Sequence, residues 1–139
     1  MKDELLPPAA LAAIETRKAY PPGYEFFAPG EPASGIYILY GGRARLTLVD
    51  SEGGELTLGF AEPGDILGLS AAVTGRQHEE RAEATLPCQA GFIKGRDFLQ
   101  FLDQHPEAAF WTVQLLSNRI ARAFEHLSAL RGSPPPRIT

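Results

Sequence analysis

The chain has 139 residues, which is the length of one ordinary domain. Hydrophobic residues make up 44% of it and charged residues 22%, a composition that excludes a mainly disordered chain. The formal charge of −4 at pH 7 provides no overall basic surface for DNA, RNA or anionic lipid. We therefore expect no nucleic-acid binding by this chain.

Several other classes of protein are excluded by what the sequence lacks. Its single cysteine, Cys88, excludes an internal disulfide, a paired-cysteine redox site and a cysteine-rich zinc site. No apolar stretch approaches the ~20 residues that span a bilayer, and the N-terminus does not resemble a secretion signal. Because the motifs GxSxG, HExxH and GxxxxGK[ST] are also missing, we expect a cytoplasmic protein that is not an enzyme.

The first two thirds of the chain predict a helix followed by a β domain. Residues 4–19 carry leucines and alanines, and Pro7 and Pro8 suit the first turn of a helix, so we predict a helix over 4–19. From 24 to 94, short apolar runs alternate with turn residues at intervals near the 8–12 residues typical of sandwiches and barrels. The fold class expected is mainly β with flanking helices: an antiparallel, eight-stranded, jelly-roll-like β-barrel.

One segment interrupts the strands and two helices follow them. Residues 68–75 are rich in alanine and bounded by glycines, which predicts one turn of helix with Ser70 as its cap. Residues 96–131 are helical, with Pro106 opening the second and longer helix. We place the folded domain at 1–131 and expect the proline-rich tail, 132–139, to be unfolded.

The long helix carries an apolar seam. Six residues recur at spacings of 3, 4, 3, 4 and 3, as in a coiled coil: Val113, Leu116, Ile120, Ala123, Leu127 and Leu130. We interpret the seam as the interface of a parallel homodimer. Packing of the same residues against the chain's own β domain stays open as the alternative.

This order of elements resembles the cyclic-nucleotide-binding domain of bacterial regulators of the catabolite activator and fumarate-nitrate reductase regulator (Crp/Fnr) family. The resemblance covers residues 10–131. Its markers are Pro29-Gly30-Glu31, Ile36-Tyr37-Ile38-Leu39 before Gly41, Gly54, Pro63-Gly64-Asp65, and Phe92-Ile93 before Arg96-Asp97-Phe98. It implies a dimeric domain that senses a small effector. Full-length members continue into a winged helix-turn-helix, which we do not expect from the short tail of this chain.

The resemblance also shows where this sequence departs from nucleotide-binding members. In those proteins a glutamate after the glycine of the inner helix binds the ribose, and an Arg-Ser pair binds the cyclic phosphate. Here the glycine is Gly68, the glutamate position is Leu69, and the Arg-Ser positions fall on His78 and Glu79. Leucine accepts no hydrogen bond and a carboxylate repels phosphate, so both signature contacts are missing.

A candidate effector pocket can still be defined from this region. Residues 68–73 resemble a subgroup that carries Gly-Leu-Ser-Ala in place of the phosphate-binding segment. A shifted register would bring Arg76 or Arg81 to the pocket, and Ser70 with the amides after it could hold a small anion. The candidate pocket comprises Gly68, Leu69, Ser70, Ala71, Ala72, Arg76, His78, Glu79 and Arg81.

Two functions remain after these exclusions. The first is a regulatory domain that senses a cyclic nucleotide or, more in keeping with the missing contacts, another small effector, with no metal or resident cofactor. The second is a ligand-free interaction module that forms heterodimers with full-length regulators through the coiled-coil helix.

Overall fold

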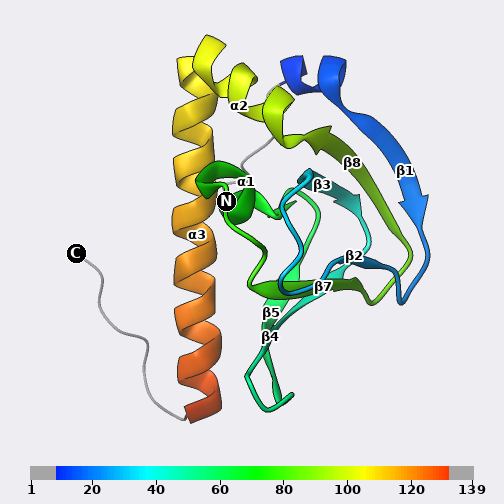
Figure 1. Ribbon diagram of the computed structural model, residues 1–139, viewed down its shortest axis with the longest axis vertical. Coiled ribbons are helices and arrows are strands. Elements are labelled where there is room, and N and C mark those ends of the chain that lie inside the picture. Colours follow the sequence, from blue (N-terminus) through cyan, green and yellow to red (C-terminus); the bar gives the residue numbers. More distant parts are fainter. Residues whose placement is uncertain (1–8, 132–139) are drawn as a thin grey trace, which may run out of the picture.

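The computed structural model describes residues 9–131, without the side chains of residues 123, 126, 127, 130 and 131 (Figure 1). The N-terminal half contains a 3₁₀ helix and six strands: η1 (Ala9–Ile14), β1 (Thr16–Tyr20), β2 (Glu25–Phe27), β3 (Gly35–Gly41), β4 (Ala44–Val49), β5 (Glu55–Ala61) and β6 (Ile66–Leu67). The rest contains three helices and two strands: α1 (Leu69–Thr74), β7 (Glu80–Ala84), β8 (Cys88–Lys94), α2 (Gly95–Gln104) and α3 (Pro106–Arg131).

The eight strands form two four-stranded antiparallel sheets, as expected of a mainly β fold with flanking helices. Sheet A has the order β1-β8-β3-β6 and sheet B the order β2-β7-β4-β5. The expected closed barrel is wrong, because no pairing between named strands joins the two sheets within residues 9–131. Edge strands β2 and β6 have only three and two residues, too few to continue the ladders around an edge.

The prediction of a helix over residues 4–19 is wrong in its second half. Only Ala9–Ile14 is helical, as a 3₁₀ helix, and Thr16–Tyr20 is strand β1, paired with β8 from Thr16↔Phe92 to Tyr20↔Cys88. The alanine-rich stretch is the part that is helical, and the residues after it pair with the edge of β8 instead. Residues 4–8 lie outside the described part of the chain.

Strands β3 and β6 of sheet A are apolar on both faces, which explains their uninterrupted hydrophobic runs, whereas edge strand β1 is mostly exposed. Along β3, Tyr37 and Leu39 point inward against sheet B, whereas Ile36 and Ile38 point outward. The outward residues form one core cluster with buried side chains of the helices, namely Leu11, Leu69, Ala72, Phe98, Phe101, Ala108, Trp111 and Leu115. The helices therefore shield the outer face of sheet A from water.

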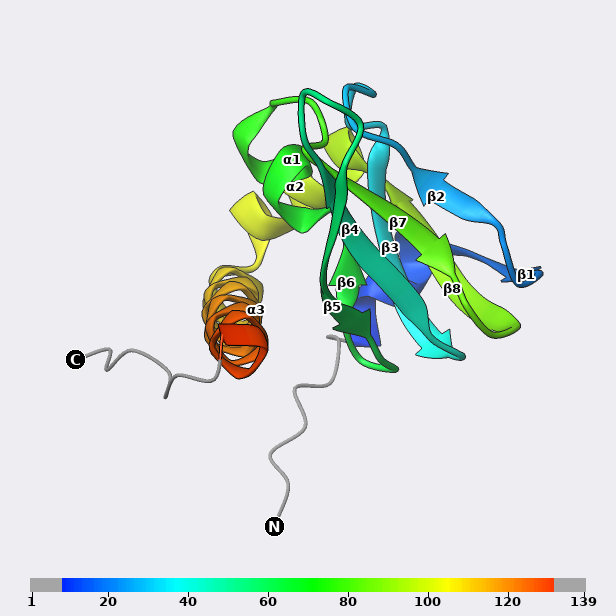
Figure 2. The same ribbon diagram turned by 90° about the horizontal axis from the view of Figure 1, so that it is seen from below.

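The three α-helices lie close to the positions predicted from the sequence. Helix α1 is bounded by Gly68 and Gly75, both with left-handed backbone (φ 82° and 75°). The prediction that Ser70 caps α1 is wrong, since Gly68 occupies the N-cap and Ser70 lies inside the helix. As expected, α3 opens at Pro106. Seen along its axis, α3 stands beside the sandwich, next to β5 (Figure 2).

Two glycines with similar backbone angles test how tightly the turn between β3 and β4 packs against Pro87. Gly42 has φ +91°, and a Cβ there would lie 2.3 Å from the carbonyl oxygen of Pro87. Gly53 has a similar φ of +85° but open space around it. We expect Gly53→Ala to lower the free energy of unfolding by about 1 kcal/mol through backbone strain alone. Gly42→Ala should cost a further ~1–3 kcal/mol because backbone must move. Urea denaturation of both variants measures the difference, and equal losses would contradict the close approach.

Candidate functional site

A cavity of about 350 Å³ lies where α1, the loop after it, sheet B and α3 meet. We call it the polar cavity. Its walls come from α1, from residues 76–79, from the leucines of the β4–β5 hairpin and from one side of α3. The lining residues are Leu48, Leu58, Gly68, Ser70, Ala71, Thr74, Arg76, Gln77, His78, Glu79, Glu80, Leu116, Arg119 and Ile120.

Six of the nine residues predicted from sequence line the polar cavity: Gly68, Ser70, Ala71, Arg76, His78 and Glu79. The other three do not. Leu69 is 2% exposed and belongs to the core, and Ala72 is buried beside the groove between α1 and α2. Arg81 donates to Glu25 and Glu55 at 2.8 and 3.0 Å. These two carboxylates hold its guanidinium, and Arg81 does not line the polar cavity.

His78 is a buried, neutral wall of the cavity. Its ring stacks on Phe27 with centroids 3.8 Å apart, and its backbone bonds to Gly30 and Glu31 fix it in place. Burial lowers the pKa of His78 below its ordinary value, although Glu31 and Glu80 act in the opposite direction. A neutral ring at this position does not supply the positive charge that a phosphate needs.

Gly68 is required by the same packing. A Cβ on Gly68 would lie 3.2 Å from the Cε1 atom of His78 and 3.3 Å from Phe27, and its left-handed φ also favours glycine. The loop therefore approaches the start of α1 as closely as a glycine allows.

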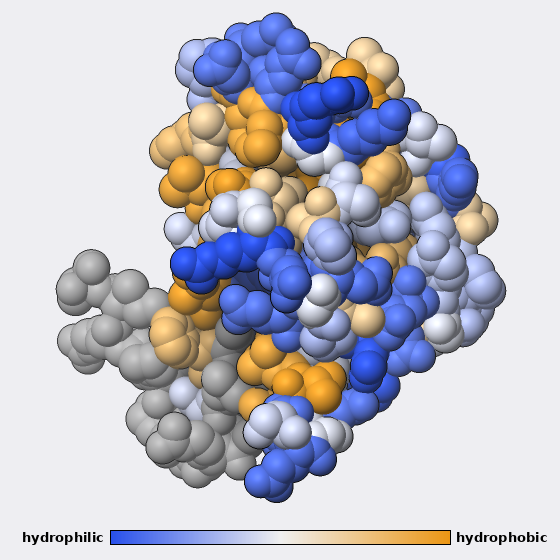
Figure 3. Space-filling model, viewed as in Figure 1, coloured by the Kyte–Doolittle hydropathy of each residue, from blue (hydrophilic) through white to orange (hydrophobic). Residues whose placement is uncertain are grey.

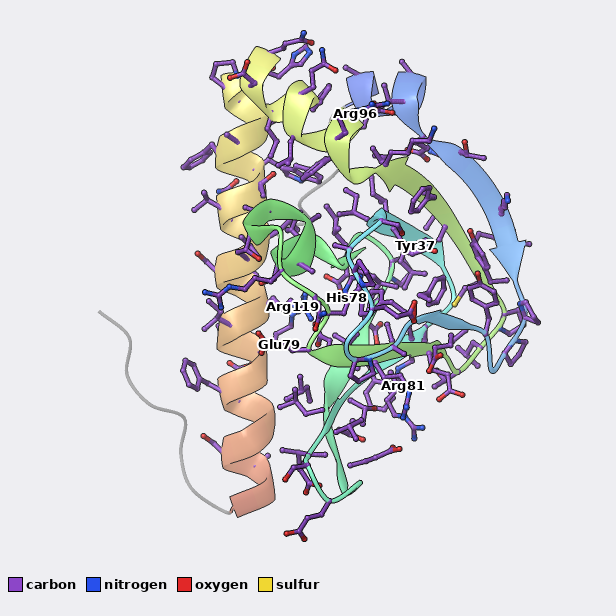
Figure 4. All side chains as sticks on the ribbon, viewed as in Figure 1. Tyr37, His78, Glu79, Arg81, Arg96 and Arg119 are labelled. Atoms are coloured by element: carbon purple, nitrogen blue, oxygen red, sulfur yellow. The ribbon has the colours of Figure 1, made fainter. Side chains whose placement is uncertain are left out.

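Two ion pairs join α3 to the sandwich. Arg119 donates to Oε1 of Glu80 at the start of β7. Arg122 binds both carboxylate oxygens of Asp65, at 3.0 and 2.8 Å, and this hydrogen bonding raises the pKa of Arg122. Figure 4 shows the Arg119 side chain directed from α3 toward the region of His78 and Glu79.

Glu80, Arg119 and the α3 side of the polar cavity were not predicted from the sequence. The apolar pattern of α3 contains a feature that indicates them. Leu115 and Leu116 belong to the face of α3 that packs on the domain, and Arg119 follows three and four residues later on the same face. A charged residue on a domain-facing stripe indicates a buried partner, which here is Glu80.

A second, smaller cavity of about 90 Å³ lies on the other side of the Glu80–Arg119 pair. We call it the apolar cavity. Its walls are mainly Leu46, Leu58, Phe60, Ile66, Leu69 and Leu115, together with the two ion pairs. Leu58, Glu80, Leu116 and Arg119 line both cavities, so the two spaces share a wall.

The predicted dimer seam is divided between two roles. Val113 and Ile120 are 57% and 54% exposed, whereas Leu116 packs partly against the chain's own core. The side chains of Ala123, Leu127 and Leu130 lie outside the described residues. Phe110 and Phe124 extend the exposed stripe at helical spacing. Figure 3 shows apolar surface along the α3 side of the molecule.

Residues 9–131 offer neither a metal site nor a membrane-spanning helix. No cluster of three or more His, Cys, Asp or Glu side chains there is arranged to hold a metal ion. None of the helices in this part of the chain is long and apolar enough to cross a membrane.

The domain is thus a two-sheet sandwich with a short inner helix over a cavity, and the long helix α3 forms one wall of that cavity. Residues 17–105 match the family model described as "Cyclic nucleotide-binding domain". The chain belongs to this family, and its resemblance to the Crp/Fnr regulators is confirmed by its relatives.

Bacterial regulators are among the proteins that the chain resembles, at low sequence identity. The chain is 29% identical over 119 residues to the Global nitrogen regulator of Synechocystis, covering 84% of this chain and 50% of that protein. The Catabolite Activator Protein of Thermus thermophilus has a TM-score of 0.74 at 24% identity, covering 88% of this chain and 57% of the other. A cyclic nucleotide-binding domain from Methylobacillus flagellatus has a TM-score of 0.77 at 18% identity, covering 93% and 74%. The chain thus spans about half the length of the curated relative.

The buried state of His78 predicts a pH dependence of stability. The pKa of His78 is lowered in the folded protein. Below pH ~6.5 the unfolded chain therefore binds a proton on His78 more readily than the folded chain does. The contribution of neutral His78 to the free energy of unfolding is therefore fully present above pH ~6.5, and it decreases as the pH falls toward the folded-state pKa. We expect His78→Gln to lose less free energy of unfolding than the wild type between pH 7 and pH 5, as measured by urea denaturation at both values. An equal loss in the two proteins would show that His78 titrates as in water.

Proposed function

We propose that this chain is the effector-sensing domain of a Crp/Fnr-type transcription regulator, and that its effector is a small molecule other than a cyclic nucleotide. The observation that carries the proposal is the polar cavity itself. One of its walls is α3, through Leu116, Arg119 and Ile120. A molecule bound there would touch the helix that leaves the domain. We assign the chain no catalysis and no DNA contact of its own.

The residues around the polar cavity argue against a cyclic nucleotide. Leu69 stands where a ribose-binding glutamate is expected, and its side chain is turned into the core. His78 and Glu79 supply one neutral ring and one negative charge where a cyclic phosphate needs positive charge. Two arginines line the cavity, but Arg119 is already paired with Glu80 and Arg76 lies on the exposed loop beside Glu79.

The position of Ile120 supports transmission from the cavity to a second subunit. Ile120 lines the polar cavity and is also 54% exposed on the stripe with Val113 and Phe124. We propose that two copies of α3 pair through this stripe as a parallel homodimer. A ligand that shifts Ile120 would then alter the contact between subunits.

A cavity-filling substitution tests effector binding. Thr74 is exposed and lines the polar cavity, so Thr74→Trp should fill it with little cost to the fold. Its neighbour Val73, 41% exposed and absent from the cavity lining, provides the matched control Val73→Trp. A small-molecule fraction of a bacterial extract should raise the thermal midpoint of the wild type and of Val73→Trp by several degrees, but not that of Thr74→Trp. Differential scanning fluorimetry makes the comparison.

Two results would contradict this proposal. Equal stabilisation of Thr74→Trp and the wild type would place binding outside the polar cavity. Saturable binding of cAMP or cGMP at micromolar concentration, measured by isothermal titration, would show that the missing signature contacts have been replaced.

The dimer is tested on the exposed stripe. We expect Val113→Glu with Ile120→Glu to convert a dimer into a monomer, because the new charges would face each other in a desolvated seam. Gln114→Glu with Asn118→Glu places the same charges on exposed polar positions of α3 and should leave the dimer intact. Light scattering after gel filtration measures the masses against the 15.1 kDa of one chain. A dimer that persists in the first variant would show that α3 does not form the interface.

The exposed stripe also supports the alternative of an interaction module that pairs with full-length regulators. Subunit exchange between this chain and a full-length relative, followed by native mass spectrometry, would reveal such heterodimers. The response of the wild type to the small-molecule fraction then separates the two functions, because a ligand-free module gives no effector response at all.

A further inference from the structure

The carboxylate of Glu80 has one oxygen without a partner in the described part of the protein. Oε1 accepts from Arg119, whereas Oε2 is buried and contacts no hydrogen-bond donor within residues 9–131. The side chain is only 15% exposed and lies on the wall shared by the polar and apolar cavities. A buried carboxylate oxygen gains most from a donated hydrogen bond, so this atom favours a ligand that carries an N–H or O–H group.

The charges around the two cavities cancel. Arg76 and Arg119 balance Glu79 and Glu80 at the polar cavity, and Arg122 balances Asp65 at the apolar cavity. His78 adds no charge because its ring is neutral. An anionic ligand would have to displace Glu80 from Arg119 and leave a buried carboxylate unpaired, which is costly. An ammonium group would lose its hydration without an unpaired counter-charge.

The apolar cavity specifies the remainder of the ligand. Its volume of about 90 Å³ is several times the ~10–15 Å³ needed to hold one water, and its leucine, isoleucine and phenylalanine walls offer a water few hydrogen bonds. A short aliphatic chain fits that environment and gains free energy by leaving water. Leu115 and Leu116 of α3 line the apolar cavity, so such a chain would contact this helix.

We infer that the effector is an uncharged molecule in which a hydrogen-bond donor, received by Oε2 of Glu80, is attached to a short aliphatic chain that occupies the apolar cavity. The inference rests on the proposed function, because it specifies what the effector site accepts. It assigns Glu80 as the residue that selects donors over acceptors. Carboxamides and alcohols are included in this chemistry, and carboxylates and phosphates are excluded from it.

Three probes of simple structure test the inference. Hexanamide has the donor and the chain, hexanoate has the same shape without the donor, and acetamide has the donor without the chain. Titration of the isotope-labelled full chain, followed by amide proton–nitrogen spectra, gives each dissociation constant and locates the shifts. We expect hexanamide to bind about tenfold or more tightly than either of the others, with shifts at Leu58, Glu80, Leu116 and Arg119.

Substitution of Glu80 supplies the decisive comparison. Glu80→Gln is nearly isosteric and places a donor where an acceptor was, so the preference for hexanamide over hexanoate should disappear or reverse. Glu83→Gln, on the same strand but bound to Arg45 outside the cavities, should keep the wild-type preference.

Each outcome decides the matter. Equal binding of hexanamide and hexanoate to the wild type, or no binding of hexanamide, overturns the inference, and so does a preference that survives in Glu80→Gln. The proposed function fails independently, if Thr74→Trp responds to the small-molecule fraction as the wild type does. A failed inference with an intact Thr74 result would leave an effector site of different chemistry.

Discussion

The burial of the central part of sheet A on both faces is the constraint on which the rest of the structure depends. One face packs on sheet B and the other would be exposed to water without helices, because Ile36, Ile38, Ile66 and Ile93 all point outward. The helices that shield them come from both ends of the chain. Leu11 of η1 and Phe98 of α2 are completely buried against this face. The domain therefore closes only when both ends of the chain have packed onto the sheet.

The same constraint positions α3 and so creates the two cavities of the proposed effector site. Apolar packing by Ala108, Trp111 and Leu115 anchors its first half to the domain. Beyond that point α3 passes the ends of the strands, where ion pairs to Glu80 and Asp65 replace the apolar contacts. Side chains do not fill the space beside these pairs, and the polar and apolar cavities remain there. The site is thus a consequence of how a straight helix leaves a sheet of limited length.

Much of the fold could be predicted from local signals, whereas the site required contacts between distant residues. Turn glycines, the Pro106 helix start and the short inner helix are encoded within a few residues of themselves. Strand β1 could not be told from a continuation of the helix, because it is defined by its pairing with β8, more than sixty residues away in the sequence. Arg81 looked available as a ligand contact, but its partners Glu25 and Glu55 lie on other strands. The role of Glu80 could not be predicted locally either, because its partner Arg119 lies on α3. Its neighbours His78 and Glu79 were found only because a family pattern marked their positions.

Leu116 shows that the two sides of the proposed effector site differ in how freely they can change during evolution. This one side chain lines both cavities, packs on the core and lies beside the exposed stripe of α3. A substitution there alters stability, ligand fit and subunit contact together, so selection rarely finds a change that suits all three. Residues 74–79, apart from His78, are not constrained in this way. They are exposed, and they contact neither the core nor the exposed stripe of α3. New ligand preferences in this lineage should therefore arise on the loop side of the site, while the helix side drifts slowly.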